Sequence, residues 1–327
     1  MERRVNHLHH NMKPGAVKSL KIALAALAAI AIAGELGLKY SATAGIITVL
    51  SIQNTKRETL KSARNRALAF LCALMLSAGS FFILDYTLWA FALYLFLFAF
   101  LCLSMGWGEA IAMDSVLVTH FLSERSMSPG LMLNEALLFC IGTGLGILVN
   151  LHLRRKGAEF DRLAEEADMQ IKGILHRMAV WLLKEDKSEY TAGCFESLQK
   201  SLDSAERCAA ANYGNVLFNA DTRELDYIKM REQQSLILKE IYLNIKGLVY
   251  LPGQAAQVAN LLDRIEQCYH RDNTVKELLE ELEQLMRQMK EEQLPQTREE
   301  FEARAVLFYI LKQLQIFLEL KRQYILD

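Results

Sequence analysis

The chain has 327 residues, of which 52% are hydrophobic, and a formal net charge of -1 at pH 7. Acidic and basic residues are interleaved rather than gathered in a basic stripe, so no nucleic-acid partner is expected. The average hides a division, because residues 17–151 carry long apolar runs whereas residues 154–327 are rich in Glu, Lys, Gln and Arg. We therefore expect a transmembrane domain over residues 1–156 and a soluble cytoplasmic domain over residues 157–327.

The apolar half divides into six expected membrane helices, since about 20 apolar residues cross a hydrocarbon core of about 30 Å. They cover residues 17–38, 41–53, 67–84, 88–105, 108–122 and 131–151. The second is short and requires a tilt, a local thinning of the bilayer or a re-entrant path. The fifth contains Glu109, Asp114 and His120, so we expect it to be buried among its neighbours.

The basic residues predict the orientation, because cytoplasmic loops retain Lys and Arg. They gather in the tail before the first span, at the exit of the sixth, and between spans two and three. The last group comprises Lys56, Arg57, Lys61, Arg64 and Arg66. This distribution predicts a multi-pass protein of the cell membrane, surrounded by lipid, with both termini in the cytoplasm.

The polar half shows one-sided apolar stripes at helical spacing, which is typical of amphipathic helices in water. The stripes fall at residues 167–182, 238–248, 275–289 and 307–317. Pro252 and Pro295 mark helix breaks, and Thr274 and Thr297, each followed by Glu three positions later, are predicted N-caps. We expect a bundle of four to six helices, and therefore an all-α protein. The heptad-like stripe at 275–289 is either a buried face of this bundle or a contact with a second subunit.

No motif in the sequence indicates catalysis. The chain has no GxGxxG, no P-loop, and no Ser/His/Asp or Cys/His arrangement. Its six cysteines are scattered and show no spacing suited to a metal. We therefore predict no enzymatic activity, no cofactor and no metal site.

Ionisable side chains inside the expected spans are the candidate site residues, because a charge at the bilayer centre costs a few kcal/mol and usually faces water or a partner. Glu109 and His120 fall within about 20° of each other around the fifth helix, so they can line one wall. Asp114 points toward a different neighbour. Glu135 shares a face of the sixth span with Gly142 and Gly146, a small-residue stripe that permits close helix packing.

Two interpretations of these groups stay open. In the first, they form a pathway for protons or substrate, with carboxylate pKa values raised by burial. In the second, Glu109 and His120 reach interfacial water at opposite ends of a short span, and Glu135 is a buried hydrogen-bonding residue. The basic cluster is equally ambiguous. It either sets the topology and attracts anionic lipid, or Arg64 and Arg66 attract organic anions to an inner mouth.

Three stretches of the chain resemble the bacterial aromatic acid exporter family. The run SIQNTKRETLKSARNR at residues 51–66 is similar to the family's connection between spans two and three. The run IGTGLGILVN at residues 141–150 resembles its sixth span, and VLVTHFL at residues 116–122 its fifth. Ala69 and Ala73 stand where the family often has glycines. The resemblance covers the whole chain, because members of this length carry a helical cytoplasmic domain after the sixth span.

The resemblance implies export of aromatic or other small organic acids, with Arg66 and Asn150 at matched positions. Related plant organic-anion channels share this plan in a dimer, and six spans are few for a carrier, so we expect a homodimer. The expected function is a proton-coupled or passive exporter with its path among spans two, three, five and six. The alternative is a membrane-anchored signalling or scaffolding protein that acts through its helical cytoplasmic domain.

Overall fold

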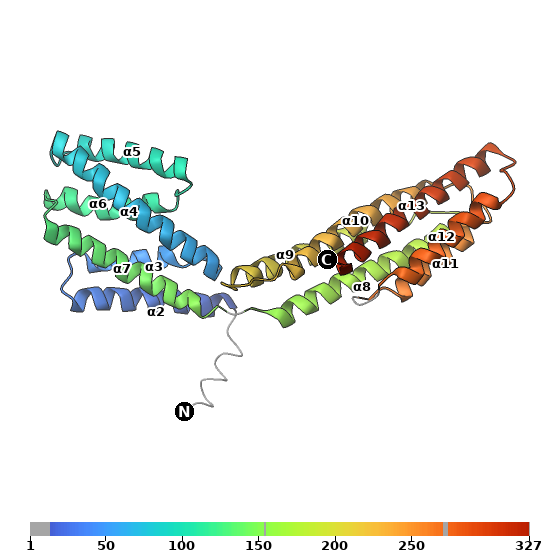
Figure 1. Cartoon of the computed structure of the whole chain (residues 1–327), viewed down its shortest axis with the longest axis horizontal. Coiled ribbons are helices and arrows are strands. Elements are labelled where there is room, and N and C mark those ends of the chain that lie inside the picture. The colour runs from blue at the N-terminus through green and yellow to red at the C-terminus, as the bar shows by residue number, and fades with distance from the viewer. Residues whose placement is uncertain (1–13, 154, 271–273, 327) are drawn as a thin grey trace, which may run out of the picture. The chain divides into compact units, whose positions relative to one another are not determined.

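The computed structural model describes residues 14–153, 155–270 and 274–326, which form helices α2 to α13 with no strand among them (Figure 1). The predicted all-α class is confirmed. The basic tail at residues 3–13 and Arg154 lie outside the described residues. The chain divides into two compact units. The first contains the residues up to 155 together with 214–220, and the second contains residues 156–213 and 221–327.

The first unit holds six helices among the described residues, and four of them, α2, α4, α5 and α7, are long and apolar enough to cross a membrane. The other two are shorter. At about 1.5 Å per residue, the 11 residues of α3 span about 16 Å and the 15 residues of α6 about 22 Å, less than a core of about 30 Å. The bounds are α2 Pro14–Glu35, α3 Ser41–Ser51, α4 Lys56–Leu84, α5 Leu88–Met105, α6 Ala110–Glu124 and α7 Pro129–Leu151.

Helix α4 begins at Lys56 rather than at the expected residue 67. Thr55 is its N-cap, and its hydroxyl accepts a hydrogen bond from the backbone N–H of Glu58 at 3.3 Å. The basic segment, expected to be a connection, is therefore helical. With 29 residues, α4 is about 44 Å long and exceeds a hydrocarbon core, so its basic first turns continue beyond the apolar part.

Helix α3 packs closely against α2 on one side and α7 on the other, at positions where glycine removes the side chain. A Cβ on Gly45 would stand 2.7 Å from Ile30, and one on Gly142 would stand 2.6 Å from Ile47. A Cβ on Gly146 would likewise stand 2.6 Å from Cβ of Ser51. The helices approach this closely because small residues let their backbones meet.

The other helices of the first unit form a second group, with α4 packed on α5, α6 and α7 (Figure 1). Ala69 and Ala73 of α4 are fully buried. The rings of Phe70 on α4 and Phe139 on α7 stack with centroids 5.1 Å apart. These contacts join the α4–α5–α6 group to the α2–α3–α7 group.

The second unit is a bundle of six described helices, within the predicted range of four to six. The predicted stripes supply its core, since Ile171, Met178, Ile245, Leu282 and Leu314 are all fully buried. Pro252 and Pro295 lie between helices as expected. The bounds are α8 Gly157–Leu182, α9 Gly193–Gly214, α10 Arg223–Gly247, α11 Ala255–Gln267, α12 Lys276–Glu291 and α13 Arg298–Leu326.

One of the two predicted caps is confirmed and the other is wrong. The hydroxyl of Thr297 accepts a hydrogen bond from the N–H of Glu300 at 3.1 Å, at the start of α13. At the start of α12, however, the N-cap is Val275, with φ of 55° and no side-chain capping bond. Val275 is 2% exposed. Burial of its side chain in the core therefore sets this helix start, and not a cap by the hydroxyl of Thr274.

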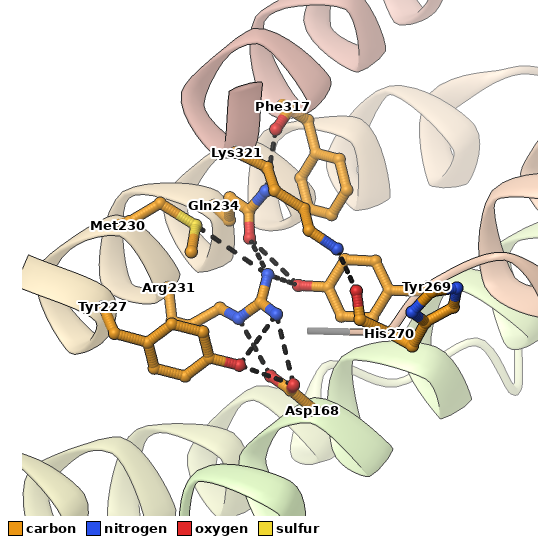
Figure 2. A network of polar contacts seen from close by, with 9 residues as sticks. All are labelled: Asp168, Tyr227, Met230, Arg231, Gln234, Tyr269, His270, Phe317 and Lys321. Carbon is orange, nitrogen blue, oxygen red and sulfur yellow. Dashed lines mark hydrogen bonds and ion pairs between the residues drawn. The ribbon is translucent and has the colours of Figure 1, made fainter. Parts of the chain in front are cut away.

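A buried guanidinium organises the centre of the second unit (Figure 2). Arg231 of α10 is fully buried, and its Nε lies 2.8 Å from Oδ1 of Asp168 on α8. Its Nη2 donates to the hydroxyl of Tyr227 at 2.9 Å, and its Nη1 donates to Oε1 of Gln234 at 2.7 Å and to the hydroxyl of Tyr269. A buried charge is tolerated only when it is paired and hydrogen-bonded in this way.

The partners of Arg231 also bind one another and extend the network to α13. Burial raises the pKa of the Tyr227 and Tyr269 hydroxyls, so both stay protonated and can donate. Tyr227 donates to Oδ2 of Asp168 at 2.5 Å, and Tyr269 donates to Oε1 of Gln234 at 2.9 Å. The amide of Gln234 in turn donates to the backbone carbonyl of Phe317 at 2.7 Å. The network therefore joins α8, α10, α13 and the segment that follows α11.

The close packing of α3 on α7 yields a stability prediction. Gly142→Ala places a methyl group against the side chain of Ile47 and the backbone carbonyl of Ala44, so the helices must separate. Overpacking of this kind costs about 1–3 kcal/mol. We expect a lower thermal unfolding midpoint in detergent. The matched control is Gly144→Ala on the same helix, where nothing lies within 4 Å of the new carbon. Equal midpoints for the two variants would contradict the close approach.

The Arg231 network yields a second prediction. Asp168→Asn removes the anion from a fully buried guanidinium, a change that costs about 3 kcal/mol in buried pairs. Hydrogen–deuterium exchange of α8 and α10 should then accelerate by about a hundredfold. Glu166→Gln on the same helix is the control, because its ion pair with Arg162 is exposed and worth less than about 1 kcal/mol. Exchange that is as slow in the Asp168 variant as in the control would show that the pair is not a structural centre.

Candidate functional site

Arg66 is a buried cation in the first unit, with only 5% of its side chain exposed. Its Nη2 lies 3.5 Å from Oε2 of Glu109, and its Nη1 lies 3.4 Å from Oγ of Ser51 and 3.8 Å from Sδ of Met113. These distances are at the long end of hydrogen bonding. Its Nε has no hydrogen-bond partner among the described residues. A guanidinium offers five N–H donors, so this one is incompletely used.

Glu109 meets Arg66 from the connection between α5 and α6, where it is the N-cap of α6. Its Oε2 also accepts hydrogen bonds from Oγ of Ser62 at 2.8 Å and from Nε2 of Gln53 at 3.2 Å. Unlike Arg66, the side chain of Glu109 is 63% exposed. One carboxylate oxygen therefore lies among three donors that come from α4 and from the connection after α3.

A pocket of about 340 Å³ opens beside these residues. It is lined by a buried cation, three amides, one hydroxyl, further charged side chains and Trp107, which packs on the core formed by α4, α5 and α6. This combination of a few polar groups with an aromatic wall is usual for sites that bind small molecules. The lining residues are Gln53, Asn54, Glu58, Lys61, Ser62, Asn65, Arg66, Gly106, Trp107, Glu109 and Ala110.

Asn150 fastens the wall of this pocket to α7. Its Nδ2 donates to the backbone carbonyl of Gln53 at 2.8 Å and to the hydroxyl of Thr59 at 2.6 Å. Thr59 in turn donates to the carbonyl of Thr55 at the start of α4. The small-residue stripe of Gly142 and Gly146 leads along α7 toward Asn150, so both features hold the end of α3 in place.

Asp114 lies deeper in the first unit, on α6, and is fully buried. Neither of its carboxylate oxygens has a hydrogen-bond partner among the described residues. Arg66 interacts with it electrostatically rather than through a direct hydrogen bond. A carboxyl group in such surroundings is costly to keep charged, which is a common property of groups that bind and release protons in function.

His120 and Glu135 form a second polar cluster toward the other end of α6. Nδ1 of His120 lies 2.6 Å from Oε2 of Glu135, which is fully buried on α7. The other oxygen of Glu135 accepts a hydrogen bond from Asn134 at 2.9 Å. Thr43 of α3 lies 3.5 Å from Nε2 of His120, and the ring of Tyr40 stacks on the imidazole at 3.9 Å between centroids. This cluster ties α3, α6 and α7 together.

An exposed ion pair covers the outer side of this second cluster. Nζ of Lys39 lies 2.9 Å from Oε2 of Glu124, and the hydroxyl of Tyr40 donates to Oε1 of Glu124 at 3.1 Å. Asn134 binds both the N–H and the carbonyl of Lys39. Tyr40 itself has a φ of 61°, a left-handed conformation that a non-glycine residue adopts only where its surroundings hold it.

The structure separates the residues that the sequence placed on one wall. Glu109 precedes α6 and His120 lies near its end, about 16 Å further along the helix, so each belongs to a different cluster. Arg66 joins Glu109 at the pocket, whereas Arg64 is exposed on α4 and does not line it. Sequence reasoning missed Gln53, Ser62 and Trp107. Gln53 and Ser62 lie within the basic run that resembles the exporter family, which is the one signal that pointed to them.

The pocket presents the cations Arg66 and Lys61 together with the carboxylates of Glu58 and Glu109. Among the described residues, no group of three or more His, Cys, Asp or Glu side chains is arranged to hold a metal ion. A guanidinium beside amide and hydroxyl donors matches the planar, two-oxygen geometry of a carboxylate. The adjoining indole offers an apolar surface to the rest of a small organic acid.

Comparisons with known proteins match both halves of the chain. The family model described as "Aromatic acid exporter family member 1" matches residues 12–153. The model described as "Putative aromatic acid exporter C-terminal domain" matches residues 158–322. The "Uncharacterized protein YqjA" of Bacillus subtilis (strain 168) is 26% identical over 304 residues, which is 93% of this chain and 94% of that protein.

A solved structure described as "Crystal structure of putative membrane protein from Clostridium difficile 630" is also similar to this chain. It is 27% identical, with a TM-score of 0.46, and the match covers 51% of this chain and 99% of that one. The resemblance predicted from residues 51–66, 116–122 and 141–150 is confirmed by the family matches. With its apolar helices and these matches over both halves, the chain belongs to the aromatic acid exporter family of membrane transport proteins.

Proposed function

We propose that this protein exports small organic anions, with aromatic acids as the class that its family suggests. The observation that carries the proposal is the buried, incompletely hydrogen-bonded guanidinium of Arg66 at the edge of a pocket in the membrane unit. A buried cation is costly unless it is well paired, and its partner Glu109 lies 3.5 Å away, at the long end of an ion pair. The aromatic side chain of Trp107 and the pocket volume of about 340 Å³ suit a small ring-bearing acid.

The proposal includes a membrane arrangement. Helices α2 to α7 all cross or enter the bilayer, with α3 and α6 supported by longer neighbours because they are too short to cross alone. The basic first turns of α4 lie on the cytoplasmic side, since Lys and Arg are retained there. Both termini are then cytoplasmic, and the pocket at Arg66 faces the compartment from which an exporter takes its cargo. We extend the proposal to a homodimer, because six helices are few for a carrier.

Proton coupling is the finer part of the proposal. Asp114 is fully buried between the pocket at Arg66 and the His120–Glu135 pair, and its oxygens have no hydrogen-bond partner among the described residues. A proton that binds there when an anion binds Arg66, and that leaves when the anion leaves, would keep the buried charge constant. Passive export without a proton is the alternative within the same class.

A role in signalling or scaffolding is the second candidate, and one observation favours it. The second unit has a pocket of its own, of about 330 Å³, beside the Arg231 network and lined in part by Asp168, Tyr227 and Tyr269. A sensor domain can bind a ligand in such a pocket while the membrane helices serve as an anchor. Absence of organic-anion flux through the purified wild-type protein would favour this candidate.

The transport proposal predicts the effect of removing Arg66. In vesicles containing the purified protein, uptake of labelled benzoate at pH 8 should fall at least about tenfold in Arg66→Met, because a charge-assisted pair to the carboxylate is lost. Arg66→Lys should retain part of the flux, since it keeps the charge but loses the planar fork. The matched control is Arg64→Met, two residues away on the exposed face, where little change is expected. Equal flux in the two methionine variants would refute the pocket as the anion site.

The coupling proposal predicts a separate effect for Asp114. Asp114→Asn keeps the shape of the side chain but cannot carry a proton, so benzoate flux down its own gradient should persist while its stimulation by an imposed pH gradient disappears. Asp85→Asn, at an exposed position after α4, is the control and should respond to the gradient like the parent. Stimulation of the Asp114 variant to the wild-type level would exclude this residue as the proton carrier, whereas a wild-type flux that does not respond to the gradient would indicate passive export.

A further inference from the structure

The pocket at Arg66 already contains a carboxylate that belongs to the chain. Oε2 of Glu109 lies 2.8 Å from Oγ of Ser62, 3.2 Å from Nε2 of Gln53 and 3.5 Å from Nη2 of Arg66. Three donors from separate positions thus meet at one carboxylate oxygen. This is the arrangement that a bound organic acid requires, since each donor would serve the carboxylate of a substrate equally well.

Glu109 is held less firmly than the groups that bind it. Its side chain is 63% exposed, whereas that of Arg66 is 5% exposed. It stands on the short connection between α5 and α6, which begins at Gly106 with a φ of 70°, and it precedes the first residue of α6. An exposed side chain at a helix start can turn into solvent without disturbing the core, whereas the donors of α4 cannot follow it.

The contacts of Arg66 indicate that the pair is replaceable. Its distance to Glu109 is longer than that of a strong charge-assisted hydrogen bond, which is about 2.7–2.9 Å. Its other contacts are also long, at 3.4 Å from Nη1 to Oγ of Ser51 and 3.8 Å from Nη1 to Sδ of Met113. Its Nε has no hydrogen-bond partner among the described residues. A ligand that engages the guanidinium with two oxygens would therefore gain contacts that Glu109 does not make.

We propose that Glu109 is an internal occupant of the carboxylate site, which an incoming organic acid must displace from Arg66, Ser62 and Gln53. The inference rests on the proposed transport function and describes how access of the substrate to its binding site is regulated. While Glu109 is in place, the anion site is filled and the pocket is closed to weak or non-specific anions. An acid whose ring also packs on Trp107 gains enough to displace it.

Displacement lowers the apparent affinity, because the ligand binds only the fraction of molecules whose site is free. Replacing Glu109 by Gln keeps the size of the side chain but removes the competing charge. The affinity for an aromatic acid should then rise, the opposite of what loss of a binding residue would cause. Glu58 is the matched control, since it lines the same pocket with the same charge, and no hydrogen bond or ion pair joins its side chain to the three donors among the described residues.

The first test measures benzoate binding by isothermal titration calorimetry on the purified full-length protein in detergent at constant pH. We expect the Kd to fall by about tenfold or more in Glu109→Gln and by less than about threefold in Glu58→Gln. An equal fall in both variants would mean that the effect is general electrostatics, and weaker binding by Glu109→Gln would make Glu109 a part of the binding site. Either result overturns the proposal.

A second measurement needs no substrate. Phenylglyoxal modifies accessible arginines, and mass spectrometry of the full-length protein gives the rate at Arg66. We expect this rate to increase several-fold in Glu109→Gln but not in Glu58→Gln. Unchanged rates would overturn the proposal that Glu109 occupies the site. If Arg66 becomes more reactive in Glu109→Gln while no variant binds benzoate, Glu109 does cover the arginine, and the proposed export of aromatic acids is rejected. If benzoate binds equally well to all variants, the protein does bind an aromatic acid, and the proposal that Glu109 occupies the carboxylate site is overturned.

Discussion

The close approach of α3 to α7 decides where the polar groups of the first unit stand. Because Gly142 and Gly146 have no side chains, the short α3 lies directly on α7. Its end then delivers Ser51 to Arg66 and Gln53 to Glu109, while Asn150 binds the carbonyl of Gln53. Larger side chains at Gly142 and Gly146 would push α3 away from α7 and break these contacts. The anion site therefore depends on helix packing as much as on the charged residues that form it.

The polar groups along α6 lie in two separate clusters with a buried carboxylate between them. The pocket at Arg66 lies by the start of the helix, and the cluster of His120, Glu135 and Tyr40 lies toward its end. Between them, Met113, Leu117 and Phe121 are buried with Asp114 in their midst. A pocket lies beside the start of the helix. Direct contacts among α3, α6 and α7 join its other end, next to a second pocket of about 310 Å³ lined in part by Lys39, Glu124 and Asn134. In the proposed export path, the contacts at this end would have to open before cargo could leave.

The sequence predicted the helices well because apolar periodicity reports burial directly, and the stripe from Leu307 to Phe317 is an example. It also identified Asp114 and Glu135 as ionisable groups inside the spans, but it placed Arg66 at the entrance of a span and not in a buried position. It did not predict that α4 begins at Lys56, since an apolar run marks where lipid begins and not where a helix does. The shared wall of Glu109 and His120 stays a prediction: the two residues lie about three turns apart along one helix, each with its own polar partners. Gln53 and Ser62 became visible only through contacts between helices.

The shortness of α3 and α6 has an electrical consequence. Where water fills the hollow at Arg66, the membrane voltage falls mainly across the sealed remainder of the bundle, which is thinner than a full hydrocarbon core. In the proposed export path, an anion at the guanidinium would have crossed little of the field, and most of the electrical work would belong to the step past Phe121 and His120. At about 2.3 kcal/mol per charge for each 100 mV, an inside-negative potential would itself drive a monovalent acid outward.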